Sequence, residues 1–289
     1  MRETAAHVGN EDQAASWNGP AGRNWTNRQA MQDELLAPVS TILTAQANIA
    51  AGENVVDIGC GCGATSLEFA RRVQPGGAVL GLDISGPMLA RARVLTPAGA
   101  PVRFVEADAT IYPFEAGWAD ALASRFGVMF FADPVLSFAN MRRGLREGGR
   151  VVFACWREPK ANPWMMAPLH EACKHAPRLP ELAPDDPGPF SFASEERVRR
   201  ILGDAGLADI ALTSFDVSLD IAVGKGLDNA VSSALEIGPA SRALDGQPPD
   251  IRAAAARSIR AMMAERQQGD SVLLGGGIWI VSAVNPTGG

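Results

Sequence analysis

The sequence predicts an α/β protein built on a doubly wound sheet of seven strands with helical insertions. Two observations predict this fold. Short β-branched runs alternate with helical patterns between residues 51 and 156, and a glycine-rich turn follows the first run. The chain has 289 residues, of which 47% are hydrophobic, and this suits one large domain with insertions, or one and a half domains.

The first strand, turn and helix form one continuous stretch over residues 55–69, which reads VVDIGCGCGATSLEF. Asp57 lies near the end of the strand, and Gly59, Gly61 and Gly63 follow it. Glycine permits a tight turn and lets a ligand approach the bare backbone, while the helix start presents unpaired N–H groups. The stretch predicts a nucleotide site, with Asp57 orienting the turn or reaching an amino group of the ligand. The alternative is a glycine turn that has only a packing role and binds no ligand.

Two further strands are expected at residues 78–85 and 102–106. The first ends in Asp83, followed by Ile84, about twenty residues beyond the turn, where a ribose-binding carboxylate belongs. Ser85 is expected to cap the next helix, and Met88 lies on its first turn. The thioether of Met88 suits a wall for an adenine ring, although ordinary core packing is the alternative.

The second of these strands is followed by Asp108 and Ala109, and a lone aspartate in this position also forms turns. The fourth strand and its exit cover residues 118–127, so Ser124 and Arg125 lie at a carboxyl end that faces the ligand crevice. Asp133 is expected to cap a helix that ends at the glycine pair 148–149, and residues 150–156 supply the fifth strand.

The order of these motifs resembles the class I S-adenosylmethionine (SAM) dependent methyltransferases, in the broad ubiquinone/menaquinone methyltransferase-like group that acts on small molecules. The matching motifs lie between residues 55 and 156, roughly a third of the chain. The resemblance implies a Rossmann-like fold, SAM as cosubstrate, and a last strand that is antiparallel and lies between strands five and six. It also implies that Asp108 accepts from the adenine amino group, that the Ala109 N–H donates to a ring nitrogen, and that the backbone near Ser124 meets the methionine moiety.

The chain outside this core is expected to form a lid. The expected parts are residues 1–50, an N-terminal helical lid segment; 51–156, the SAM-binding core; 157–193, a lid insertion; 194–221, core continued; 222–270, a helical lid insertion; and 271–289, the last strand and a tail. Residues 1 to about 16 are polar and alanine-rich, and the very start of this stretch is expected to be poorly ordered. Trp17 and Trp25 lie in a Gly/Pro/Asn segment that is predicted to be a loop. Either the segment covers the cofactor, or the two rings only pack into the surface of the domain. Thr26 is predicted to open a capping box, and the helix is expected to restart at Pro38.

Candidate catalytic residues are few. His170 lies in a helical stretch at 164–176 and is the candidate base, with a surface histidine as the alternative. Arg125 and Arg157 follow strands four and five, where either can clamp a carboxylate or pair with a neighbouring acid. Trp156 and Trp164 are candidates for the wall of an acceptor pocket, or for core, together with Met165 and Met166.

Composition and charge limit the partners and locations that the sequence allows. The net charge of −6 and the pI near 5.2 argue against nucleic acid as a partner. No apolar run reaches the ~20 residues of a membrane span, and no secretory signal pattern is present, so a cytoplasmic location is expected. Cys60 and Cys62 lack further ligands at metal-site spacing, so neither a metal nor a disulfide is expected.

Three functions are weighed. The first is transfer of a methyl group from SAM to a small-molecule acceptor by in-line displacement. The second is an NAD(P)-dependent oxidoreductase that uses the same turn, and the third is a non-catalytic SAM-binding protein. The pair Asp108–Ala109 favours SAM, and the single tyrosine, Tyr112, belongs to no Tyr-x-x-x-Lys pair. The acceptor, its reacting atom and the oligomeric state do not follow from the sequence.

Overall fold

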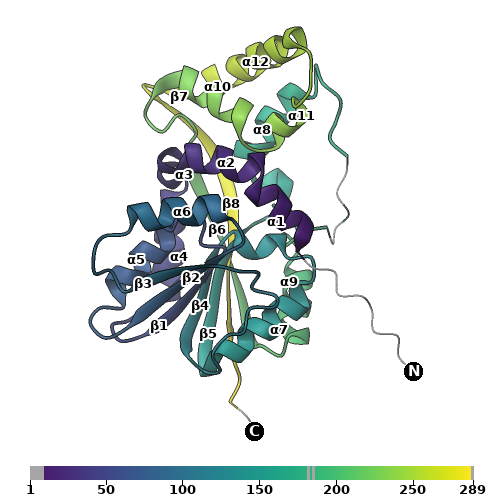
Figure 1. Ribbon diagram of the computed structural model, residues 1–289. Helices are drawn as coiled ribbons and strands as arrows, with labels where there is room; N and C mark the ends of the chain where they lie inside the picture. Colours follow the sequence, from purple (N-terminus) through teal and green to yellow (C-terminus); the bar gives the residue numbers. More distant parts are fainter. Residues whose placement is uncertain (1–9, 181–182, 184–185, 288–289) are drawn as a thin grey trace.

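The computed structural model describes residues 10–180, 183 and 186–287 (Figure 1). The N-terminal residues 1–9, which include the histidine at position 7, lie outside the described residues. The helices that precede the sheet are α1 (Glu11–Asn18), α2 (Pro20–Asn27), α3 (Gln29–Leu35) and α4 (Ala37–Ala47). No helix within the described ranges is both long enough and apolar enough to cross a membrane.

One sheet organises the molecule, in the order β3–β2–β1–β4–β5–β8–β6. Its strands are β1 (Asn54–Ile58), β2 (Ala78–Asp83), β3 (Val102–Glu106), β4 (Ala119–Arg125), β5 (Leu145–Trp156), β6 (Ala208–Asp220) and β8 (Ser271–Val284). Strands β1 to β5 pair in parallel, whereas β8 lies antiparallel between β5 and β6. The short β7 (Gln267–Gln268) pairs with the start of β8. The predicted placement of the last strand is confirmed.

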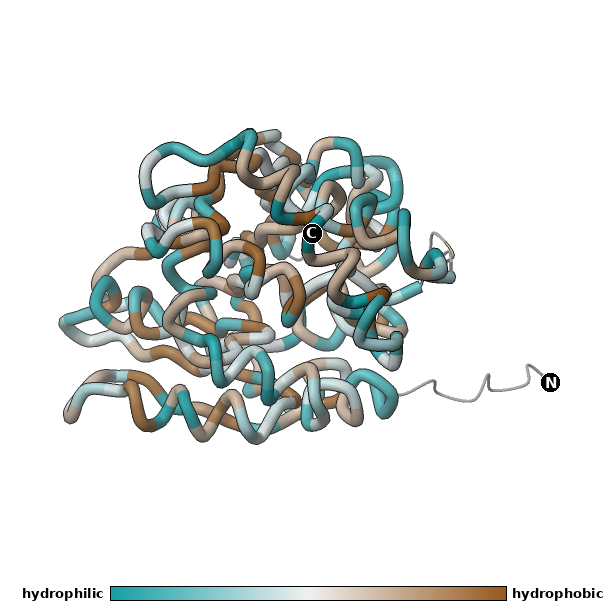
Figure 2. The backbone as a smooth tube through the Cα atoms, turned by 90° about the horizontal axis from the view of Figure 1, so that it is seen from above, coloured by the Kyte–Doolittle hydropathy of each residue, from teal (hydrophilic) through white to brown (hydrophobic). Residues whose placement is uncertain are grey.

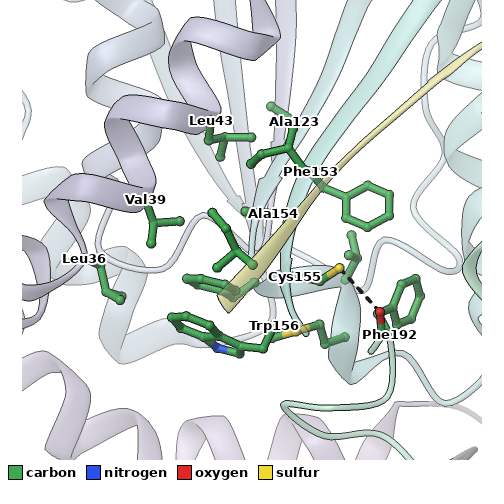
Figure 3. Packing of buried hydrophobic residues seen from close by; sticks show 14 of the residues in the cluster. Leu36, Val39, Leu43, Ala123, Phe153, Ala154, Cys155, Trp156 and Phe192 are labelled. Carbon is green, nitrogen blue, oxygen red and sulfur yellow. Dashed lines mark hydrogen bonds between the residues drawn. The ribbon is translucent and has the colours of Figure 1, made fainter. Parts of the chain in front are cut away.

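Helices cover both faces of the sheet, which explains the continuous apolar runs of the central strands. The first face carries α4, α5 (Ala64–Arg72) and α6 (Gly86–Leu95), and the second carries α7 (Pro134–Gly144) and α9 (Glu195–Asp204). Figure 3 shows Leu36, Val39 and Leu43 to one side of the strands and Phe153 and Phe192 to the other. All five side chains are buried.

Several helix ends follow the local rules read from the sequence. Ser85, Asp133 and Ser194 each cap a helix by accepting a hydrogen bond from the backbone N–H three residues later. Gly206, with φ of +84°, follows the end of α9, where a left-handed residue is favoured. These ends depend on neighbouring residues alone, and the predicted caps at Ser85 and Asp133 are confirmed.

Two local predictions in the N-terminal segment were wrong. The segment between Trp17 and Trp25 is helical, because Pro20 suits the first turn of α2 and the chain breaks only at Gly19. Thr26 lies inside α2, where its hydroxyl donates to Gly22 O at 2.8 Å, so it opens no capping box. The very start of the chain, expected to be poorly ordered, lies outside the described residues.

The helix after Asp133 also ends earlier than predicted. Helix α7 stops at Gly144, and β5 begins directly at Leu145. The glycine pair 148–149 therefore lies within β5, where Gly148 has φ of +68° and the pairing between β4 and β5 shifts register. A glycine with positive φ suits such an irregular strand as well as it suits a helix end.

A helical cap sits above one edge of the sheet (Figure 1). It consists of α8 (Pro163–Ala172), α10 (Gly226–Glu236), α11 (Pro239–Ala243) and α12 (Pro249–Ala264). The chain enters α8 after β5 and enters α10 after β6. Strands β5 and β6 point in the same direction, because both are antiparallel to β8. Both insertions therefore leave the sheet at the edge where the glycine turn follows β1. We call this edge, where the parallel strands end, the carboxyl edge. Seen from above, apolar segments run through the middle and hydrophilic segments lie at outer turns (Figure 2).

Candidate functional site

The glycine turn joins β1 to α5, and its three glycines have φ of +64°, +55° and +86°. A Cβ atom at Gly59 would lie 2.6 Å from the Cα atom of Gly127, and one at Gly63 would lie 3.0 Å from the ring of Phe104. At Gly61 a Cβ atom would meet nothing closer than 3.8 Å. Gly59 and Gly63 are thus required by packing, whereas Gly61 leaves its backbone open to a ligand.

Asp57 is completely buried below this turn. Its Oδ2 atom accepts hydrogen bonds from Thr65 Oγ1 at 2.7 Å and Ser66 Oγ at 2.6 Å, both on the first turn of α5. Its Oδ1 atom is buried without a partner. Burial raises the pKa of Asp57 to about 6, although the two hydroxyl hydrogen bonds oppose the increase. Thr65 and Ser66 were not predicted as site residues, although they follow the glycine turn directly in the sequence.

Asp83, at the end of β2, forms a hydrogen bond with the same turn. Its Oδ2 atom accepts from the N–H of Gly61 at 2.7 Å, and its Oδ1 atom accepts from the N–H of Ser85 at 2.8 Å. Burial raises the pKa of this carboxyl group. Each oxygen retains a lone pair for a further donor. The neighbouring Ile84 is half-buried, and Met88 is buried with its sulfur beside Gly61.

Asp108 lies after β3, as predicted. Its Oδ1 atom accepts from Asn10 Nδ2 and from the N–H of Thr110, both at 2.8 Å. No described residue donates to its Oδ2 atom. Ala109 is buried beside it, and its carbonyl accepts from Asn140 Nδ2 at 3.0 Å.

The segment of residues 10–27, which we call the N-terminal strap, closes over these strand ends. The buried side chain of Asn10 bonds the Asp108 loop, and its Oδ1 atom accepts from the N–H of Ala132 at 2.8 Å. Asn18 donates to Ile84 O at 2.8 Å and accepts from the N–H of Gly86 at 2.9 Å. The strap is therefore fastened to the exits of β2, β3 and β4. Neither asparagine was predicted from the sequence to lie in the site.

The two tryptophans belong to this strap. Trp17 packs edge-on against Phe130, with ring centroids 5.3 Å apart, and against Trp25 at 6.3 Å. The carbonyl of Trp17 accepts from Ser85 Oγ at 2.8 Å. Both indoles are half-buried. Trp17 thus lies at the exits of β2 and β4, and Trp25 packs beside it.

The end of β4 supplies two polar side chains that point to opposite faces. Ser124 is buried, donates to Ile58 O at 2.7 Å and accepts from the N–H of Gly127 at 3.1 Å, so it joins the exits of β1 and β4. Arg125 lies on the face of Asp57 and donates to Ser40 Oγ at 2.7 Å and to Asp33 Oδ1 at 3.4 Å.

Phe126, which the sequence analysis did not select, has an unusual backbone. Its φ is +68°, a left-handed conformation that is uncommon for a bulky residue. Regular alternation along β4 would place its ring on the face of Ser124. The left-handed conformation instead stacks the ring on Trp156, at 4.1 Å between centroids and 12° between planes. Trp156 in turn packs against Trp164 of α8 at 5.0 Å.

Two candidates from the sequence lie away from the glycine turn. Arg157 pairs with Asp216 of β6 at 2.8 Å and lies 5.4 Å over the ring of Trp279 of β8. It is therefore on the far side of β5 from β1. His170 is exposed on α8. In the described part of the chain, neither side chain forms a hydrogen bond or an ion pair with Asp57, Asp83 or Asp108.

The two cysteines of the turn are buried. Burial raises the pKa of the Cys60 thiol, and it raises that of Cys62 to about 11. Burial thus disfavours the thiolate form of both side chains. Within the described ranges, no three His, Cys, Asp or Glu side chains are grouped to hold a metal ion.

The family described as "Methyltransferase domain" matches residues 55–149. This segment contains the glycine turn, Asp83, Asp108 and the exit of β4. Residues 55–149 form a class I SAM-dependent methyltransferase domain. The expected family and the α/β fold are thereby confirmed.

Individual relatives agree with this domain. An uncharacterized protein of Mycobacterium tuberculosis is 30% identical over 176 residues, which is 61% of either chain. The chain thus spans about three fifths of the length of the curated relatives it matches first. Demethylmenaquinone methyltransferase of Thermus thermophilus is 41% identical over 103 residues, 35% of this chain and 46% of that protein.

Solved structures share the fold at low identity. The YcgJ protein of Bacillus subtilis superposes with a TM-score of 0.56 at 17% identity, covering 86% of this chain and 98% of that one. Phosphoethanolamine N-methyltransferase 2 of Haemonchus contortus, solved with S-adenosyl-L-methionine, gives a TM-score of 0.51 at 18% identity, covering 86% and 53%.

Proposed function

We propose that the chain is a methyltransferase that transfers a methyl group from SAM to a small-molecule acceptor. One observation carries the proposal: three neighbouring strands each end in a carboxylate with unused acceptor capacity. Among the described residues, one oxygen of Asp57 and one of Asp108 have no donor, and each oxygen of Asp83 accepts an N–H. The ammonium, ribose hydroxyls and adenine amino group of SAM are three donors that match these acceptors.

The charge of Asp57 supports SAM rather than a nicotinamide dinucleotide. In dinucleotide sites the pyrophosphate lies at the N-terminus of the helix after the glycine turn. Here the first turn of α5 directs Thr65 and Ser66 to Asp57. A buried carboxylate at this place repels a phosphate and attracts an ammonium or sulfonium. The oxidoreductase alternative is therefore disfavoured.

Positioning is the main task that this proposal gives the protein. SAM, when bound, supplies a methyl group on a sulfonium leaving group. The open backbone at Gly61 and the carboxylate of Asp83 would hold the adenosine half, and the N-terminal strap would exclude water above it. Holding an acceptor in line with the methyl group can lower the barrier by roughly 7–11 kcal/mol.

We place the acceptor against Phe126 and Trp156, beside Arg125. All three side chains lie on the face of the sheet that carries Asp57. The left-handed conformation of Phe126 costs about 1–2 kcal/mol, and such strain is typical of functional sites. Arg125 uses only part of its five N–H donors on Ser40 and Asp33, so it can also bind an acidic acceptor.

The proposal assigns no general base. His170 is exposed and Arg157 is engaged with Asp216 and Trp279. An acceptor such as an amine or a thioether reacts without losing a proton first. We therefore assign positioning roles only.

Calorimetry on ligand-stripped protein tests the proposal, with SAM, S-adenosylhomocysteine, NADH and NADPH as ligands. We expect the two adenosyl compounds to bind and to raise the melting temperature by a few degrees, since about 100-fold excess over Kd adds about 2.7 kcal/mol. Binding of the nicotinamide compounds alone would overturn the proposal. Binding of SAM without methyl transfer to any acceptor of a broad panel would leave a non-catalytic binding protein.

A further inference from the structure

The second face of the sheet carries a hollow that the methyl-transfer site does not use. The described chain forms no helix between β3 and β4, and a cavity of about 220 Å³ lies there. Val56, Leu80 and Arg103 stand in one register row across β1, β2 and β3 and line its floor. Because side chains alternate along a strand, this row faces away from Asp57. The hollow is thus separated from the glycine turn by the sheet itself.

Aromatic rings form the walls of the hollow. Tyr112 and Phe114 meet edge to face with ring centroids 4.9 Å apart, and Trp118 completes the lining. Helix α7 fixes these walls in two ways. Asn140 Nδ2 donates to Tyr112 O at 2.9 Å, and Gly144 makes room for Phe114, whose Cβ atom would lie 2.7 Å from a Cβ atom at Gly144. The walls are therefore held in place before any ligand arrives.

Two opposite charges stand at the hollow. Arg103 and Glu115 both line it, and both are exposed. Neither side chain makes a hydrogen bond or an ion pair with any described residue. Aromatic and aliphatic side chains together with one cation and one anion complement a molecule that has an aromatic ring and both charges.

We propose that this hollow binds a single-ring aromatic amino acid. The ring lies on Val56 and Leu80 between the aromatic walls, the carboxylate accepts from Arg103, and the ammonium faces Glu115. A cavity of about 150 Å³ holds benzene, so about 220 Å³ suits one ring with a short side chain. The proposal does not depend on methyl transfer, because the site lies on the other face of the sheet.

Calorimetry with three probes tests this site: L-phenylalanine, 3-phenylpropionate, which lacks the ammonium, and phenethylamine, which lacks the carboxylate. We expect L-phenylalanine to bind at least about tenfold more tightly than either partial probe. Arg103→Gln should weaken L-phenylalanine and 3-phenylpropionate about tenfold and spare phenethylamine. Glu115→Gln should weaken L-phenylalanine and phenethylamine and spare 3-phenylpropionate. Both side chains are exposed, so neither variant disturbs the core.

Arg93→Gln is the matched control. It removes the same charge from α6, which covers the first face, and should leave all three affinities unchanged. Absence of L-phenylalanine binding at millimolar concentration, equal binding of the three probes, or indifference to Arg103→Gln would each overturn the proposal. The titrations are repeated with S-adenosylhomocysteine present. Failure of that compound to bind would refute the proposed function and leave the test of this hollow intact.

Discussion

Replacing Asp57 by asparagine removes a buried negative charge and keeps an oxygen that can accept from Thr65 and Ser66. Burial raises the pKa of Asp57 from its ordinary value of 3.8 to about 6. The folded protein therefore retains a proton that the unfolded chain releases between about pH 4 and pH 6, so the free energy of unfolding falls as pH rises through this window. A pKa displacement of this size corresponds to about 3 kcal/mol.

We expect the unfolding free energy of the wild type, relative to that of Asp57→Asn, to fall by about 3 kcal/mol between about pH 3 and pH 7. Urea denaturation across this range measures the difference. The new amide also leaves a buried N–H group at the unpartnered position, which costs about 1–3 kcal/mol, but this term does not change with pH. A difference that is constant, or that rises with pH, would refute the reasoning.

Asp120→Asn is a control for which the pH dependence of stability should have the opposite sign. Burial raises the pKa of Asp120, but hydrogen bonds from the N–H of Asn54 and from Arg146 outweigh burial and lower it. Its contribution to stability is lost as pH falls, so the difference between wild type and variant should rise with pH.

Asp57→Asn should also bind S-adenosylhomocysteine about 10–100-fold more weakly, since a charge-assisted hydrogen bond contributes about 1.5–3 kcal/mol.

Three further changes test the site. Asp83→Ala should weaken S-adenosylhomocysteine at least about tenfold in calorimetry, and unchanged affinity in a folded variant would count against the ribose assignment. Asn10→Ala removes hydrogen bonds that contribute about 0.5–1.5 kcal/mol each. Hydrogen exchange of the backbone amides in α1 should therefore become at least about tenfold faster than in the wild type, while global stability changes little. Equal exchange rates in variant and wild type would mean that Asn10 does not hold the strap in place. Gly59→Ala should destabilise the protein by about 1–3 kcal/mol in thermal unfolding, because its Cβ atom would collide with Gly127. Gly203→Ala, in open space on α9, should be neutral or stabilising, and a similar loss in both variants would contradict the turn geometry.

The sequence by itself determined the parts of this protein that depend on neighbouring residues. The glycine turn, the acids after β1, β2 and β3, and the caps at Ser85 and Asp133 follow from local spacing, because each needs only a few consecutive residues. The resemblance of these motifs to a family added the antiparallel position of β8. Local rules also failed where two structures suit the same residues, as at Gly148 and in the segment from Trp17 to Trp25.

Only the tertiary structure decided how distant residues meet at the carboxyl edge. Asn10 bonds Asp108 across 98 residues, and no spacing in the sequence signals that contact. Arg157 follows β5 as predicted, but β6 and β8 supply Asp216 and Trp279, and these contacts hold it away from the turn. The stack of Phe126 on Trp156 depends on a left-handed residue that local preference disfavours. Surrounding packing must supply the energy for that conformation, and packing exists only once the chain has folded.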